Sequence, residues 1–189
     1  MPQHSTFIEE MMAAGRGVLG LFVGNRQSGS YFDFSQRGLI GSFIALLLVT
    51  VLNASMPTIM GAEGDSITRA LIIAGTLFAL QLGCAALALR QLNRLDGFVP
   101  YLVADNWTTF FVSLLMVAVI AAGLGSQFTT IVLGIVVIVI QVNIGRLVVT
   151  LPPLQIAMFL VAQMVGLTIG LVLVGFILPV PPDAIVPAA

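Results

Sequence analysis

Seven polar or charged side chains interrupt or border the apolar stretches of this sequence, and they are the residues that could do chemistry. They are Gln81, Asp105, Asn106, Gln141, Asn143, Arg146 and Gln163. Ionisable groups in apolar surroundings usually pair or line a cavity, because an isolated charge in hydrocarbon is costly. One interpretation is therefore a candidate polar cavity open to the cytoplasm, which a small solute or a lipid head group could enter. Arg146 would be its cationic anchor and Asp105 the counter-charge.

A second interpretation of the same residues stays open. Glutamine and asparagine side chains often hydrogen bond between neighbouring membrane helices, where they hold the helices together. Arg146 would then extend its charged end to the lipid head groups. Asn143 and Arg146 are three residues apart and share a helix face. Trp107 is expected at the membrane interface, where tryptophan is enriched.

The sequence indicates no enzyme. His4 is the only histidine and Cys84 the only cysteine. The HExxH, Walker A, GxSxG and CxxC patterns are missing from the sequence. Glu9 and Glu10 are expected to be hydrated on a polar helix face. We therefore expect no catalytic residue, no metal site and no cofactor.

The elements that must position the polar residues are transmembrane helices. From Gln127 to Leu178 the chain is apolar apart from one interruption, RLVVTLPPLQ at 146–155. Each flanking half is long enough to cross a hydrocarbon layer of ~30 Å. The proline pair cannot lie inside a helix, so a short turn is expected there, with Thr150 as a cap and Pro152 in the first helical turn. Five spans are predicted, at Leu39–Ile59, Ile67–Leu89, Trp107–Gly123, Phe128–Val149 and Leu154–Leu178.

Composition supports this class and limits the partners. The 189 residues are 59% hydrophobic and only 8% charged, with a net charge of -1, whereas soluble domains carry roughly 25% charged residues. The chain has no basic run, so nucleic acid is not expected as a partner. Membrane lipid is the expected partner, and other membrane-protein subunits or further copies of the chain are alternatives. The fold class predicted is all-α, a polytopic bundle of five transmembrane helices.

An amphipathic helix is predicted before the first span. Thr6 and Glu9 form a capping-box pattern, and apolar residues gather on one side of a helix over 6–24. Such a helix suits the membrane surface, and docking on the bundle or on a partner is the alternative. Ser35 is expected to cap the first span. Residues 1–38 thus form an N-terminal interfacial segment, 39–178 the five-span bundle and 179–189 a proline-rich extracytoplasmic tail.

The arginines indicate the orientation. With a cytoplasmic N-terminus only Arg69 lies on the outer side, and the other six face inward. These six are Arg16, Arg26, Arg37, Arg90, Arg94 and Arg146. An odd number of spans then places the C-terminus outside.

Two stripes of small residues are expected where helix backbones touch. One consists of Gly75, Ala79 and Gly83 and the other of Gly166 and Gly170. Small residues let membrane helices approach closely. Contact within one chain is favoured over contact between copies.

A family resemblance is suggested by three stretches, GRGVLGLFVGNRQ at 15–27, PYLVADNWTTFF at 100–111 and RLVVTLPP at 146–153. The layout resembles that of bacterial Yip-like (Ypt-interacting-protein-like) proteins, which have a cytoplasmic N-terminal segment followed by five spans. The resemblance implies a helical protein of the bacterial inner membrane. A non-enzymatic scaffold or accessory subunit, which associates through helix faces, is the function expected first. A passive channel or carrier that uses the polar cluster is the alternative, and a lipid-modifying enzyme comes third.

Overall fold

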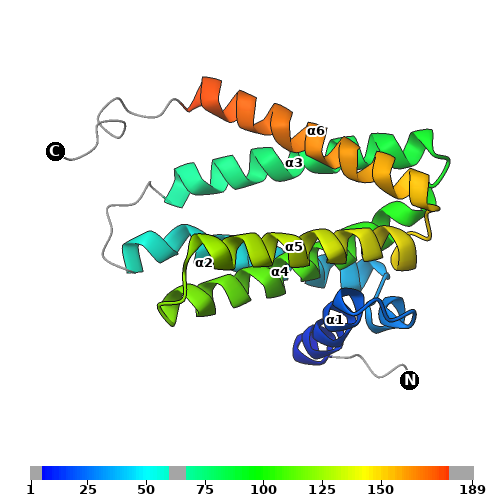
Figure 1. Ribbon diagram of the computed structural model, residues 1–189, viewed down its shortest axis with the longest axis horizontal. Helices are drawn as coiled ribbons and strands as arrows, with labels where there is room; N and C mark the ends of the chain where they lie inside the picture. Colours follow the sequence, from blue (N-terminus) through cyan, green and yellow to red (C-terminus); the bar gives the residue numbers. More distant parts are fainter. Residues whose placement is uncertain (1–5, 60–66, 179–189) are drawn as a thin grey trace.

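The computed structural model describes residues 6–59 and 67–178, and every regular element in these ranges is a helix (Figure 1). The long helices are α1 (Phe7–Phe22), α2 (Gln36–Ile59), α3 (Ile67–Gln91), α4 (Phe98–Ala121), α5 (Gln127–Asn143) and α6 (Pro153–Ile177). Short helical turns form η1 (Ser28–Tyr31), η2 (Leu95–Gly97) and the π-helical η3 (Ile144–Val148). Five helices are long and apolar enough to cross a membrane. The predicted all-α bundle with five spans is therefore confirmed, while residues 60–66, which join the first two spans, and the predicted tail at 179–189 lie outside the described residues.

The start of α4 is the main departure from the predicted boundaries. The helix begins at Phe98 and not at Trp107. Pro100 fits in its first turn because the backbone N–H groups there have no partner within the helix. As a result Asp105 and Asn106 do not lie at the end of the span. Asp105 lies seven residues after Phe98, which is roughly 10 Å along the helix axis.

The turn between α5 and α6 also differs in detail. Thr150 has a φ of 58° and does not cap α6. Pro152 is the N-cap residue instead, and Pro153 takes the first helical position. Ser35 does act as a cap, since its Oγ accepts a hydrogen bond from the Gly38 N–H at 3.4 Å.

The helices pack in two groups. α3 and α6 lie along each other, and α2 and α5 both pack on α4 (Figure 1). α1 lies across one end of the second group, which we call the α1 end. The connectors 92–97 and 149–152 link the two groups at this end. The opposite end, where α2 stops and α3 starts, is called the far end.

α1 is docked on the bundle. Both hydrogen bonds of the predicted capping box at Thr6 and Glu9 are present. The ring of Phe7 lies 5.9 Å from that of Trp107, and the Leu21 carbonyl accepts a hydrogen bond of 2.8 Å from Asn143. The face of α1 that points away from the bundle is exposed and mostly apolar. Its apolar residues are Ile8, Met12, Leu19, Phe22 and Val23, the last just after the helix, and Glu9 and Arg16 lie exposed at its edge.

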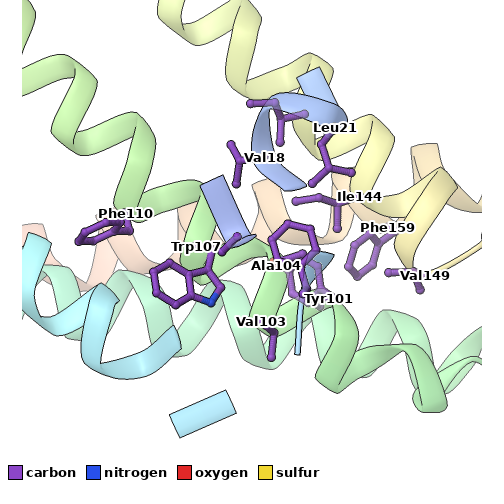
Figure 2. Packing of buried hydrophobic residues seen from close by; sticks show 14 of the residues in the cluster. Val18, Leu21, Tyr101, Val103, Ala104, Trp107, Phe110, Ile144, Val149 and Phe159 are labelled. Carbon is purple, nitrogen blue, oxygen red and sulfur yellow. The ribbon is translucent and has the colours of Figure 1, made fainter. Parts of the chain in front are cut away.

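Two side chains expected at the surface are buried near α1. Trp107 is fully buried between aromatic rings, and Figure 2 shows it in the packed core. Glu10 is only 8% exposed because it packs against Gly41 of α2. Burial raises the pKa of Glu10, the negative charge of Asp33 raises it further, and Arg37 opposes both.

The two predicted stripes of small residues have different surroundings. Gly166 and Gly170 of α6 face α3, where a Cβ at Gly166 would lie 2.6 Å from the Leu80 carbonyl oxygen. Gly75, Ala79 and Gly83 are instead exposed, and a Cβ at either of these glycines would meet no atom within 4 Å. The expected intrachain contact through Gly75 and Gly83 is therefore wrong, because the opposite face of α3 packs on α6.

Candidate functional site

Asp105 stands at the centre of a polar network inside the bundle. It is 5% exposed and accepts a short hydrogen bond from Nε2 of Gln141 on α5. Tyr101 lies one helical turn before Asp105, on the same face of α4, and its hydroxyl is within hydrogen-bonding range of the carboxyl group and of Gln81. The network thus starts from two residues of α4 and reaches α5.

Gln163 extends the network to α3 and α6. Its Oε1 accepts a hydrogen bond of 2.8 Å from the Tyr101 hydroxyl and one of 3.2 Å from Nε2 of Gln81. The ring of Tyr101 packs edge-on against Phe159 of α6, at 4.9 Å between centroids (Figure 2). Four of the seven candidate residues, Gln81, Asp105, Gln141 and Gln163, therefore come together around Tyr101. They connect the α3–α6 pair to the other group of helices.

The two asparagines lie outside this network. Asn106 donates a hydrogen bond of 3.1 Å to the Ser42 hydroxyl, which joins α4 to α2. Asn143 donates to the Leu21 carbonyl and so joins α5 to α1. Both are buried. At these positions the structure corresponds to interhelical hydrogen bonding and not to a cavity lining.

The predicted pairing of Arg146 with Asp105 is not what the structure shows. Arg146 lies exposed on the π-helical η3, whereas Asp105 is buried and accepts a hydrogen bond from Gln141. The two residues were expected to meet at the membrane boundary because α4 was expected to begin at Trp107. With the helix starting at Phe98, Asp105 lies deeper in the bundle.

A cleft of about 800 Å³ adjoins the network. Its lining comes from α2, α3, α4 and α5, and includes Gln81, Asp105 and Gln141 at one end. From these residues the lining continues along α2 and α3 to Asn53 and Ala70, which lie near the far end. The cleft therefore extends away from the α1 end, and the expectation that it opens at the arginine-rich end is wrong. Exposed residues in the lining, such as Gly75, connect it with the outside of the bundle.

The chemistry of this cleft is that of a binding site. Its walls are mostly apolar, with Leu46, Leu71 and Phe78 among the lining residues, and its inner end carries a carboxyl group and amides. Oε1 of Gln141 is buried and has no hydrogen-bond partner among the described residues, so the inner end offers an unused acceptor. Within residues 6–59 and 67–178, no three His, Cys, Asp or Glu side chains gather as a metal site would need.

Two residues were missed in the sequence, one in the site and one outside it. Tyr101 is one of them. Its four-residue spacing to Asp105 could have revealed it, because the two residues share a face of a helix that begins before Tyr101. Arg94 is the other: it donates to the Val149 carbonyl at 2.6 Å and to the carbonyl and hydroxyl of Thr150 at 2.9 and 2.6 Å. It thus holds the turn between α5 and α6 to the connector between α3 and α4. No sequence signal marks this contact, because two of the three acceptors are backbone atoms.

The fold and its five apolar helices define an all-helical integral membrane protein. Comparison with known protein families, with curated proteins and with solved structures gives no match for the chain.

Proposed function

We propose that this protein is a passive carrier that binds an amphipathic molecule, a lipid or a small solute, in the cleft between its helices. One observation carries the proposal, namely a cleft of about 800 Å³ whose apolar walls end at the Asp105 network. Ligand sites are mostly apolar clefts of roughly 300–1,000 Å³ with a few convergent polar groups. The ligand's apolar part would lie along α2 and α3, and its polar part would reach Gln81, Asp105 and Gln141. The protein would catalyse no reaction.

A substitution that fills the cleft without disturbing the fold tests this function. Gly75 lines the cleft and has open space at its Cβ, so Gly75→Phe places a ring there with no clash in the helix packing. Gly83→Phe is the matched control, because Gly83 is equally open, lies on the same helix and does not line this cleft. Mass spectrometry of protein purified in a mild detergent measures the lipid that stays bound. We expect Gly75→Phe to lose this lipid and Gly83→Phe to keep it.

A measurement of lipid flux distinguishes transport from binding alone. Vesicles that contain the protein and a fluorescent phospholipid analogue in one leaflet report its movement to the other leaflet. Gln141→Leu removes a polar group from the cleft end and should abolish this movement while the protein remains folded. Equal rates for the variant, the unchanged protein and protein-free vesicles would contradict the carrier function.

For location we propose the bacterial plasma membrane, with the N-terminus and the α1 end in the cytoplasm, as in the Yip-like proteins that the layout resembles. Six of the seven arginines support this orientation, since basic residues in short loops favour the cytoplasmic side. The exposed apolar face of α1 suits a helix that lies in the membrane surface. Cysteines introduced at Gln27 and at Ser126, with Cys84 replaced by serine, would be labelled from opposite sides of intact cells. Labelling from the same side would contradict the proposed topology.

A scaffold or accessory subunit is the second candidate, and one observation favours it. The exposed small residues Ala79 and Gly83 leave a face of α3 that another helix can approach closely. The partner would be a membrane-protein subunit or a second copy of the chain. Cross-linking through a cysteine at Gly83 measures this association, and Gly83→Leu should weaken it. A protein that stays monomeric at all concentrations and captures no subunit would argue against a scaffold.

A further inference from the structure

The charge at the inner end of the cleft has no positive partner in its hydrogen bonds. The carboxyl group of Asp105 bonds to the amide of Gln141 and lies within hydrogen-bonding range of the Tyr101 hydroxyl, and both groups are neutral. Asp105 is 95% buried, since 5% of its surface is exposed. A buried carboxylate whose partners are all neutral is unfavourable, because hydrogen bonds only partly replace the water that it has lost. A positively charged group in the cleft would remove this cost.

The arginines on both sides of Asp105 in the sequence are positioned elsewhere. Arg90 is exposed at the end of α3, and Arg69 donates a hydrogen bond to the Leu178 carbonyl. Arg94 binds the turn at Val149 and Thr150, and its Nε lies 3.7 Å from the carboxylate of Asp96. Arg146 is exposed on η3. Among residues 6–59 and 67–178, the cleft lining contains one acidic residue, Asp105, and no basic one. The positive charge that complements Asp105 would therefore come from the ligand.

The unused acceptor beside Asp105 limits the chemical class of the ligand further. Oε1 of Gln141 is buried and has no hydrogen-bond partner in the part of the chain that the structure describes. A primary ammonium group carries three N–H donors, so it can bind a carboxylate and an amide oxygen together. A quaternary ammonium has the same charge but no N–H donor. The walls that lead to this end are lined by Leu46, Leu71 and Phe78, which suit an alkyl chain.

We propose that the ligand of the cleft is a cationic amphiphile, with a primary ammonium head at Asp105 and Gln141 and an apolar tail between α2 and α3. This inference rests on the proposed binding function and names the chemical class of its ligand. Three probes of equal chain length test the role of the charge and the role of the N–H donors separately. Decylammonium carries charge and donors, decanamide carries donors without charge, and decyltrimethylammonium carries charge without donors.

Equilibrium dialysis of the three probes against the purified protein in a non-ionic detergent measures their affinities, with empty micelles as the background. We expect decylammonium to bind about 10- to 100-fold more tightly than decanamide, as charge-assisted hydrogen bonds do. Asp105→Asn keeps the shape and the acceptor for Gln141 but removes the charge, and it should abolish this difference. Asp96→Asn is the matched control, because it makes the same chemical change on an exposed carboxylate outside the cleft. It should leave the difference intact.

Each other result overturns a defined part of the inference. Equal affinity for decylammonium and decanamide would overturn the charge preference while leaving the proposed function in place. Equal affinity for decyltrimethylammonium and decylammonium would overturn the role of the N–H donors. A preference for decylammonium that persists in Asp105→Asn would exclude Asp105 as the partner. If Asp105→Asn does not fold, Asp105→Glu and Gln141→Leu replace it. Both keep a carboxylate and should keep the preference for decylammonium over decanamide, whereas Gln141→Leu alone should weaken the preference for decylammonium over decyltrimethylammonium. Failure of all three probes to bind would overturn the proposed function together with this inference.

Discussion

Replacement of Gly166 by alanine should weaken the contact between α3 and α6. A Cβ at this position would lie 2.6 Å from the Leu80 carbonyl oxygen and 2.9 Å from Cα of Gln81. Both are backbone atoms, so no side-chain rotation can relieve the contact. The two helices would have to move apart, and the hydrogen bond between Gln81 and Gln163 would lengthen with them.

The size of the effect follows from a comparison with Gly75. Alanine in place of glycine stabilises a helix interior by up to about 1 kcal/mol, and this gain applies at both positions. Overpacking costs about 1–3 kcal/mol and applies only at Gly166, because a Cβ at Gly75 meets no atom within 4 Å. Gly166→Ala should therefore have a free energy of unfolding about 1–3 kcal/mol lower than Gly75→Ala. The helix-propensity term cancels in this difference.

Reversible unfolding in mixed micelles of a mild detergent and dodecyl sulfate, followed by circular dichroism, gives the two free energies. Gly170→Ala should fall between them, because the nearest atom there is Cδ2 of Leu77, at 2.8 Å on a flexible side chain. A Gly166→Ala protein as stable as Gly75→Ala would refute the close approach of α3 and α6 at this point.

Two further predictions concern the α1 end. Arg94→Ala should lower the free energy of unfolding by about 1–3 kcal/mol, because hydrogen bonds from a charged group are lost, and should speed amide hydrogen exchange at 149–152. Arg90→Ala is the control at an exposed site. Equal exchange rates at 149–152 in the two variants would contradict this prediction. Glu10 should make the docking of α1 dependent on pH, because burial and then Asp33 raise the pKa of its carboxyl group. An acid with a raised pKa in the folded state favours that state in its protonated form. This contribution is complete below the ordinary carboxyl pKa of 4.5 and is lost as the pH rises through the raised pKa. Hydrogen exchange of α1 should therefore slow in acid relative to neutral pH, after correction for the intrinsic rate, and Glu10→Gln should remove the dependence.

The sequence predicts the helices well and their mutual contacts poorly. Long apolar runs and capping patterns such as Thr6 with Glu9 depend only on neighbours along the chain, and the structure contains both. The start of α4 was misplaced because Asp105, Asn106 and Trp107 look like an interface. Their burial depends on groups from other helices, such as Ser42 of α2, which no local pattern shows.

The sequence predicted most of the residues that form the candidate site but not how they are arranged. Gln141 does bond to Asp105, and Gln81 and Gln163 bond to each other beside Tyr101, since buried polar groups in apolar helices must find one another. The direction in which the cleft extends was predicted wrongly, because the sequence does not show which side of the network is packed and which side is hollow. The stripe at Gly75 was misassigned for a related reason, as small residues mark a possible contact on a helix without showing which face the neighbour takes.

The docking of α1 has a consequence for the order of assembly during synthesis. The Leu21 carbonyl binds Asn143, a residue 122 positions later in the chain. At translation rates of about 5–20 residues per second, roughly 6 to 24 seconds pass before this partner is made. During that interval α1 lacks this hydrogen bond, although its contacts with Gly41 and Trp107 can form earlier, and its outward-facing Ile8, Met12 and Leu19 suit it to the lipid surface. The docking of α1 would thus be completed only when the fourth span has emerged.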